Sequence, residues 1–233
     1  MSRATKSEQL FDEFCKSHDV LPVRLPECDG QKQPDYEVFF NGQKVIFEIK
    51  QVEPNEADKK YNAPLKRGGI ATQTRNPDKV AERIRDGIKE GRGQIKSYLR
   101  NNPGTPAVIV FYDNANNRYT DPYTIQTAMH GWEQVVFSVP SNGQPPEVVE
   151  RGFGKRNNKA MRPDKNEQIS AIATLHETWD VITKERLLSL CFYHNKYATH
   201  RFTPIWWQGN NIFHYTLEDK VQGQFQNWKV LPK

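Results

Sequence analysis

Two carboxylates and a lysine in one short segment of this 233-residue chain are spaced so that they could act together. Asn41-Gly42 lies between two runs of alternating apolar and polar residues, which predicts a two-residue hairpin turn of type I′. In that register Asp35 faces Glu48, with Cβ atoms roughly 4.5–5.5 Å apart. Lys50 shares the face of Glu48, one pleat further along the strand. The three side chains are therefore expected to converge on one face of the hairpin.

The chemistry that such a group favours is hydrolysis of a phosphodiester bond. A hard divalent cation such as Mg²⁺ prefers oxygen ligands, and one or two carboxylates are its usual protein partners. Both Asp35 and Glu48 could reach one ion, and the carbonyl of Ile49 is a further candidate ligand. Lys50 would hold or polarise the attacking water and offset negative charge developing on the phosphate. The opposite face of the hairpin is apolar and suits a core: Tyr36, Val38, Val45, Phe47 and Ile49.

The surrounding elements predict an α/β domain with a mixed sheet flanked by helices. We expect a helix over residues 7–18 with Ser7 as its N-cap, and a short strand over 21–25. Residues 51–76 read as irregular. A helix is expected over 77–101, which Gly87, Gly91 and Gly93 could kink or divide. The apolar run at 107–112 predicts a buried central strand. Further elements are a helix from Asp121 to 129 and strands over 134–139, 169–175 and 187–193.

Pro34-Asp35 followed by Glu48-Ile49-Lys50 resembles the PD-(D/E)XK motif of the restriction-endonuclease-like nuclease superfamily. The resemblance implies an αβββαβ core in which the aspartate and glutamate bind the metal and the lysine assists the water. Gln51, directly after the lysine, also occurs in several branches and is assigned to substrate binding. The resemblance extends from about residue 7 to residue 112.

Two helical positions extend the resemblance to the motif. Glu8 stands where many members carry a glutamate that completes the metal site. Gln94 and Tyr98 resemble the QxxxY signature of RecB-type members, which assigns Gln94 to the catalytic group and Tyr98 to the substrate. Each of these residues also has a structural alternative. Glu8 could be an ordinary surface acid, Tyr98 a core aromatic, and the hairpin charges could serve to protect an edge strand.

Basic segments predict a polyanionic partner. The formal net charge is +5 and the sequence pI is about 9.0. Ten cations and four acids lie between residues 66 and 100, and six cations crowd the predicted loop at 151–165. Such segments suit contacts with phosphates that are insensitive to sequence, although part of the first could be a solvated helix face. The candidates chosen for substrate binding are Arg67, Arg75, Lys155 and Arg156.

The remaining sequence limits the class of protein. Residues 1–140 are assigned to the nuclease core and 141–233 to a strand- and aromatic-rich extension, packed on or continuing a single domain. The three cysteines are isolated, and the six histidines lack metal-ligand spacing. No signal peptide is apparent and no stretch approaches the roughly 18 apolar residues of a membrane span, so a cytoplasmic protein is expected. The aromatics around Trp206-Trp207 are expected to pack in the core rather than stack on bases.

These observations together predict a DNA endonuclease that uses Mg²⁺, with Mn²⁺ able to replace it, in restriction, phage-related or repair processes. Cutting both strands would favour a symmetric homodimer. The main alternative is a non-catalytic nucleic-acid-binding module that keeps the nuclease fold. A hydrolase of another phosphate ester is a third alternative, because its metal chemistry would be the same.

Overall fold

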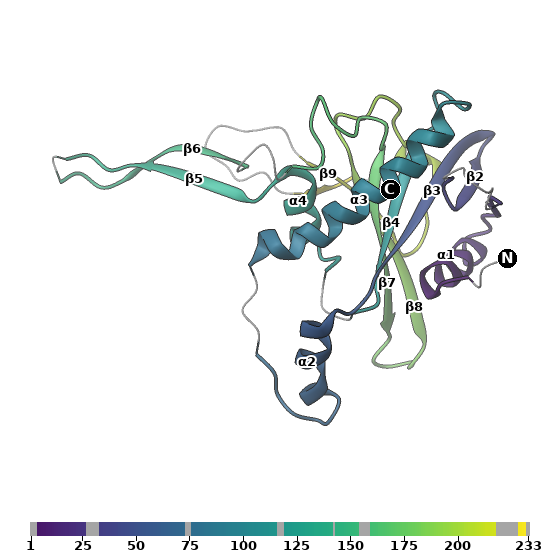
Figure 1. Cartoon of the computed structure of the whole chain (residues 1–233), viewed down its shortest axis with the longest axis horizontal. Helices are drawn as coiled ribbons and strands as arrows, with labels where there is room; N and C mark the ends of the chain where they lie inside the picture. The colour runs from purple at the N-terminus through teal and green to yellow at the C-terminus, as the bar shows by residue number, and fades with distance from the viewer. Residues whose placement is uncertain are drawn as a thin grey trace.

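The computed structural model of the protein describes residues 4–26, 33–72, 76–115, 119–141, 143–153, 159–217 and 228–231. An eight-stranded mixed sheet with flanking helices forms its centre (Figure 1). The strand order is β1-β2-β3-β4-β7-β8-β9-β10. These strands are β1 (Pro22–Arg24), β2 (Tyr36–Phe40), β3 (Gln43–Val52), β4 (Ala107–Asp113), β7 (Ala171–Trp179), β8 (Arg186–His194), β9 (Ile212–Leu217) and β10 (Trp228–Val230).

Four α-helices and a second, small sheet complete the described fold. The helices are α1 (Lys6–Ser17), α2 (Glu56–Leu65), α3 (Pro77–Leu99) and α4 (Pro122–His130), and a 3₁₀ turn covers Pro204–Trp206. Strands β5 (Glu133–Ser138) and β6 (Glu147–Phe153) form an antiparallel hairpin that projects from the body of the molecule (Figure 1). Among the described residues, no helix is both long and apolar enough to span a membrane.

The sheet is mixed, as the sequence predicts. Strand β4 lies between β3 and β7 and runs parallel to both, and β8 is parallel to β9, whereas the other neighbouring strands are antiparallel. The boundary expected near residue 140 falls in the turn between β5 and β6. Since β4 pairs directly with β7, residues on both sides of that boundary contribute to one sheet.

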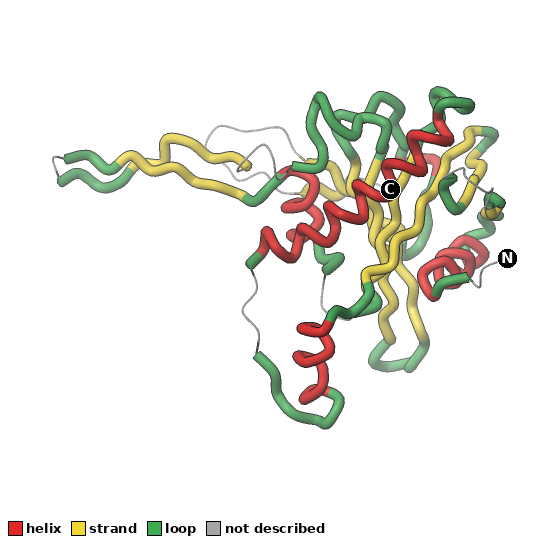
Figure 2. The backbone as a smooth tube through the Cα atoms, in the orientation of Figure 1, coloured by secondary structure: helices red, strands yellow, loops and turns green. Residues whose placement is uncertain are grey.

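Each face of the sheet carries its own apolar core. On one face, Phe11 and Phe14 of α1 pack with Phe47 of β3, and Phe202 and Trp207 from the C-terminal part join them. This aromatic cluster confirms that Phe202 and Trp207 are core residues. Helices α3 and α4 cover the opposite face (Figure 2). The protein is therefore layered, with the sheet between two sets of covering elements.

The predicted hairpin is confirmed. Asn41 and Gly42 both have positive φ, at 51° and 81°, as a type I′ turn requires. The ladder pairs Val38 with Val45 and Tyr36 with Phe47. Continuing this register places the residue before Tyr36 opposite the residue after Phe47.

Two sequence predictions about helices are wrong. The segment at 51–76 is not irregular throughout, because α2 occupies Glu56–Leu65. The Asn55 side chain accepts a hydrogen bond from the Asp58 N–H, and the Asp58 carboxylate accepts one from the Asn55 N–H. This capping box stabilises a short helix that has little apolar patterning. The N-cap of α1 is Thr5 rather than Ser7, because Thr5 forms a capping box with Glu8.

Helix α3 is one continuous helix, so its glycines do not divide it. Gly87 and Gly91 instead allow the helix to approach the sheet closely. A Cβ atom on Gly87 would lie 2.5 Å from Cε1 of Phe111, and one on Gly91 would lie 3.1 Å from Cγ of Glu48. The close packing of α3 on β3 and β4 thus depends on missing side chains at these two positions.

Candidate active site

Asp35 lies just before β2, where the strand meets the middle of β3. Its N–H donates to the carbonyl of Phe47 at 3.1 Å, which extends the ladder by one residue. Its carboxylate Oδ2 accepts a hydrogen bond from the N–H of Ile49 at 2.6 Å. Both contacts fix the carboxylate beside β3, where the hairpin register predicts it.

Glu48 is enclosed between the sheet and α3. Only 1% of it is exposed, and Gly91 of the helix packs over its Cγ. One carboxylate oxygen, Oε1, lies 2.9 Å from Nζ of Lys50. The other, Oε2, is buried with no hydrogen-bond partner among the described residues. A buried carboxylate oxygen without a partner is costly, so this atom is suited to bind a cation.

Lys50 is held between β3 and α3. In addition to Glu48, its Nζ donates to Oε1 of Gln94 at 3.2 Å and lies 4.0 Å from the exposed Glu90 carboxylate. Gln94 uses its other amide atom, Nε2, to donate to the carbonyl of Gln33 at 3.3 Å. Gln94 therefore links the lysine to the backbone that leads into Asp35. The structure brings together all four residues that the sequence assigned to catalysis.

The two carboxylates disfavour each other's charge. Burial, and then the Asp35 carboxylate, together raise the pKa of Glu48 to about 8, although the Lys50 ammonium partly opposes the shift. The pKa of Asp35 rises to about 6, because burial and the charge of Glu8 outweigh the hydrogen bond from the Ile49 N–H. A cation placed between the carboxylates would remove this repulsion.

The donors at this site fit a hard divalent cation. Because the N–H and C=O of one strand residue point to the same side, the Ile49 carbonyl points toward the edge at which its N–H meets Asp35. Two carboxylates, one carbonyl and open positions for water match the oxygen set that Mg²⁺ takes. Within the described part of the chain, no three His, Cys, Asp or Glu side chains are grouped to hold a metal. Any ion here would therefore rest on two carboxylates.

Glu8 is buried next to this group but already has partners. Its Oε1 accepts from Arg24 at 2.7 Å and its Oε2 accepts from the Thr5 N–H in the capping box. Its charge raises the pKa of Asp35, which shows that the two acids lie within electrostatic range. The metal-ligand role of Glu8 stays a prediction, and it would require one of these bonds to be given up.

Gln51 and Tyr98 lie on either side of the central group. Gln51 accepts from the Ser7 N–H at 2.8 Å, which ties the first turn of α1 to β3, and it also donates to Glu53. The Tyr98 hydroxyl bonds to Glu37 and accepts from Lys44 at 2.8 Å. Both residues stabilise the scaffold of the hairpin in this structure. Their assignment to substrate binding stays a prediction.

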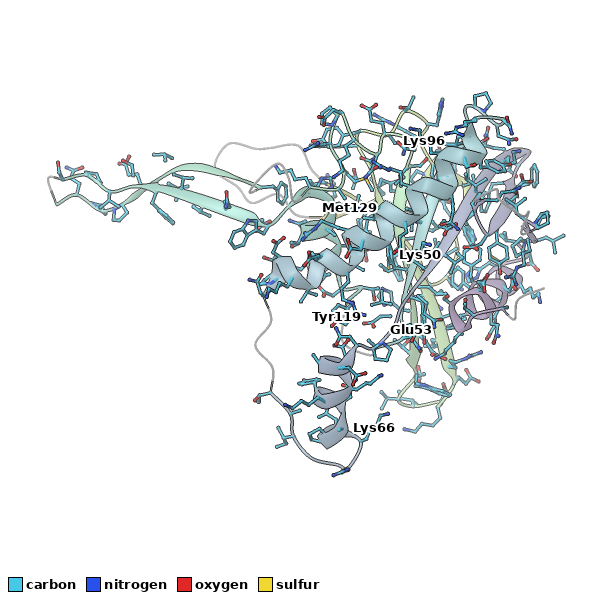
Figure 3. The ribbon with its side chains drawn as sticks, in the orientation of Figure 1. Lys50, Glu53, Lys66, Lys96, Tyr119 and Met129 are labelled. Carbon is cyan, nitrogen blue, oxygen red and sulfur yellow. The ribbon has the colours of Figure 1, made fainter. Side chains whose placement is uncertain are left out.

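Of the four basic residues chosen for substrate binding, the structure describes Arg67, which it does not bring to the site. Arg67 is exposed in the turn after α2. Its neighbour Lys66 lies at the far end of the α2 region, away from Lys50 (Figure 3). Arg75, Lys155 and Arg156 lie outside the described residues.

Several residues that contact the site were not singled out from the sequence. Glu90 lies near Lys50, Arg24 pairs with Glu8, and Gly91 packs against the side chain of Glu48. The contact of Gly91 with the site could have been predicted, because Gly91 lies three residues before Gln94 and therefore shares its side of the helix. A glycine in such a position often marks a close approach of two elements. Arg24 and Glu90 carry no comparable signal.

Comparison of the chain with protein-family models, with curated protein sequences and with solved structures gave no match. Function is therefore argued from the site itself.

Proposed function

We propose that this protein is a metal-dependent nuclease with a restriction-endonuclease-like, PD-(D/E)XK core, and that it acts as an endonuclease on DNA. The observation that carries the proposal is the cluster of Asp35, Glu48 and Lys50, in which a buried carboxylate oxygen has no partner among the described residues. A charged group of this kind is costly in a fold unless a ligand compensates it. Perturbed carboxylates at such a place are typical of functional sites.

Each residue of the site would have a separate role in the reaction. Asp35, Glu48 and the Ile49 carbonyl would hold Mg²⁺ or Mn²⁺, which supplies a hydroxide near neutral pH and stabilises charge on the phosphate. The Lys50 ammonium, 2.9 Å from Glu48, would orient the attacking water and balance the negative charge that develops. Gln94 holds Lys50 in place through its amide oxygen.

The order of elements also supports the proposal. A helix, three strands, a helix and a parallel strand follow one another as α1, β1, β2, β3, α3 and β4, with α2 inserted before α3. This order is the αβββαβ arrangement that the motif implies. The site lies where β2, β3 and α3 of this arrangement meet.

The alternative is a nucleic-acid-binding module that does not cleave. Two observations favour it. Among the described residues the site offers two carboxylates and no third acid grouped with them, and Glu48, with a pKa of about 8, is mostly protonated at neutral pH without a metal. Mg²⁺-dependent turnover distinguishes the two functions.

Incubation with circular and linear, single- and double-stranded DNA and RNA, in Mg²⁺, Mn²⁺ or EDTA, tests the proposal. We expect the wild-type protein to cleave circular DNA with either metal and not in EDTA. Lys50→Ala should lower the rate by at least about 100-fold while leaving the circular dichroism spectrum unchanged. Lys6→Ala, which removes a lysine paired with Glu177 at 2.9 Å outside the site, should leave the rate unchanged. Full activity of Lys50→Ala would refute the mechanism.

A further inference from the structure

A second concave feature lies between the end of α4 and the turn at residues 159–165. It is a cavity of about 420 Å³, within the ~300–1,000 Å³ range of small-molecule sites. Two cations of this turn, Lys159 and Arg162, line it with Lys196 from the segment after β8, and the described lining also holds one acid, Asp164. The apolar part of its wall includes Phe153, Met161 and Tyr197.

Helix α3 packs against α4, whose last residue His130 lines this cavity, and against β3, which carries Glu48 and Lys50 of the candidate active site. Arg85 and Arg92 of α3 are close enough to Lys165 of the turn to lower its pKa. These two arginines are seven residues apart and therefore share one side of the helix. Gln94, which holds Lys50, is rotated about 200° around the helix axis from Arg92. A ligand contacting both places would therefore pass over the outer surface of α3.

Hydrogen bonds fix the turn that carries these cations. The N–H groups of Ala160 and Met161 donate to the carbonyls of Ala128 and Met129 at 3.0 and 2.8 Å, which joins the turn to α4. The side chain of Asn166 donates to the Ala160 carbonyl at 2.8 Å. A reciprocal pair of backbone bonds closes the turn between residues 162 and 165. The backbone that carries Lys159 and Arg162 is therefore positioned before any ligand arrives.

The cavity has a positive electrostatic character. Burial, with the charges of Lys196 and Lys159, lowers the pKa of His130 to about 3. Burial likewise lowers the pKa of Lys165, and Arg162 is the next cause. Asp164 lies 2.8 Å from Nε of Arg162 and partly balances these charges. Among the described residues, the lining of this partly enclosed space holds three cations and one carboxylate, a composition that favours anions.

We infer that this cavity binds a phosphate group, which in the proposed nuclease is a backbone phosphate of the nucleic-acid strand held across α3 from the cleaved bond. A guanidinium and two ammonium groups converging from different segments suit an anion with several acceptor oxygens. The identity of the ligand as nucleic acid rests on the proposed function. The phosphate site itself rests on the cavity and its charges.

The test measures binding to a fluorescently labelled 20-base-pair DNA duplex in EDTA, across 50–200 mM NaCl, by fluorescence anisotropy. Arg162→Gln/Lys196→Gln should bind roughly tenfold more weakly, with a salt slope smaller by about 0.9, as expected for one lost phosphate contact. The matched control Lys16→Gln/Lys184→Gln removes two exposed lysines from α1 and the β7–β8 turn and should change neither quantity. The charge-conserving Arg162→Lys/Lys196→Arg should bind like the wild type, which separates charge from folding.

A second measurement identifies the source of the phosphate. Inorganic phosphate is titrated into the same proteins and the melting temperature is recorded. If phosphate raises the melting temperature of the wild type but not of Arg162→Gln/Lys196→Gln, the site is supported even when DNA binding is unaffected, and the ligand is free phosphate. If neither measurement separates this variant from the control, the inference is wrong.

The two proposals can fail separately. Weaker DNA binding by Arg162→Gln/Lys196→Gln, together with a wild type that never cleaves, would support the cavity and refute the nuclease. Cleavage that depends on Lys50, with unchanged DNA and phosphate binding in the cavity variant, would refute the cavity and leave the nuclease intact.

Discussion

Replacing Glu48 with glutamine should make the metal-free protein more stable at neutral and alkaline pH, while abolishing metal-dependent cleavage. The carboxyl is 1% exposed and its pKa is about 8, raised by burial and then by Asp35 from an ordinary value of 4.5. Glutamine has nearly the same shape and is never charged. The substitution therefore removes the cost of a buried charge and at the same time removes a ligand.

The sign and size follow from proton linkage. Below pH 4.5 the glutamate is protonated in both the folded and unfolded chains, so it does not lower the free energy of unfolding. Between pH 4.5 and 8 the unfolded chain releases the proton while the fold retains it, so stability falls as the pH rises, and the loss is complete above about pH 8. At about 1.36 kcal/mol per pKa unit, the loss is about 1 kcal/mol at pH 5, 3 at pH 7 and 5 at pH 9.

Glutamine introduces a smaller cost of its own. Its Oε1 can accept from Lys50 as the carboxylate does, but its NH₂ group takes the place of Oε2, which has no partner among the described residues. A buried donor without a partner costs about 1–2 kcal/mol. The variant should therefore be equal to the wild type or slightly less stable at pH 5, about 1–2 kcal/mol more stable at pH 7, and about 3 kcal/mol more stable at pH 9.

Urea denaturation in EDTA at these three pH values measures the difference. Glu177→Gln is the control: burial raises its pKa, but bonds from Lys6 and Tyr112 outweigh burial and lower it overall, so its loss should destabilise at pH 7 and 9. Mg²⁺ should stabilise the wild type more at pH 9 than at pH 5, because binding requires the ionised carboxylate, and should not stabilise Glu48→Gln. A stability difference independent of pH, or a variant less stable at pH 9, would refute the reasoning.

Three further substitutions test the packing of α3 on the sheet and the anchoring of α2. Gly87→Ala should destabilise the protein by about 1–2 kcal/mol, because the added Cβ would lie 2.5 Å from the buried ring of Phe111. Gly93→Ala has open space around the added Cβ and should stabilise the protein by about 0.5–1 kcal/mol. Thermal melting compares the two variants. Asp58→Asn should destabilise by about 1–3 kcal/mol at pH 7, because buried Asp58 accepts from Arg83 at 2.8 Å and from Tyr119 at 2.6 Å. Burial raises the pKa of Asp58 but these bonds lower it overall, so the difference between variant and wild type should shrink as the pH falls toward 3; a constant difference in urea titrations would contradict this account.

Local rules predicted the hairpin and most of the main elements. The Asn41-Gly42 turn and the alternation on either side of it are sufficient to set the register, because each residue step moves a side chain to the other face. The long helix and the apolar strand of β4 follow from periodicity. Helix α2 was missed because a capping box and the anchoring of Asp58 to Arg83 and Tyr119 stabilise it, and these partners are far away in sequence.

Residue types with two plausible roles were harder to assign. Glu8 was recognised as a candidate, but its pairing with Arg24 and its part in a capping box depend on the path of β1 beside β2. Tyr98 shares a helix side with Gln94, yet only Gln94 reaches Lys50, because Tyr98 lies one turn further along and meets Glu37. Sequence spacing fixes a side of the helix but not which strand residue lies beneath it.

Turn type and strand alternation are local properties, so the pattern of residues alone predicts that Asp35, Glu48 and Lys50 share one face of a hairpin. How strongly that face is charged depends on tertiary packing. Helix α3 approaches closely through Gly91, excludes water from Glu48 and supplies Gln94, and the resulting desolvation raises the carboxyl pKa to about 8. The cavity at residues 159–165 is likewise a tertiary property, because its cations come from segments that meet only in the folded chain. Desolvation and electrostatic potential depend on what covers a group, and sequence spacing does not specify that.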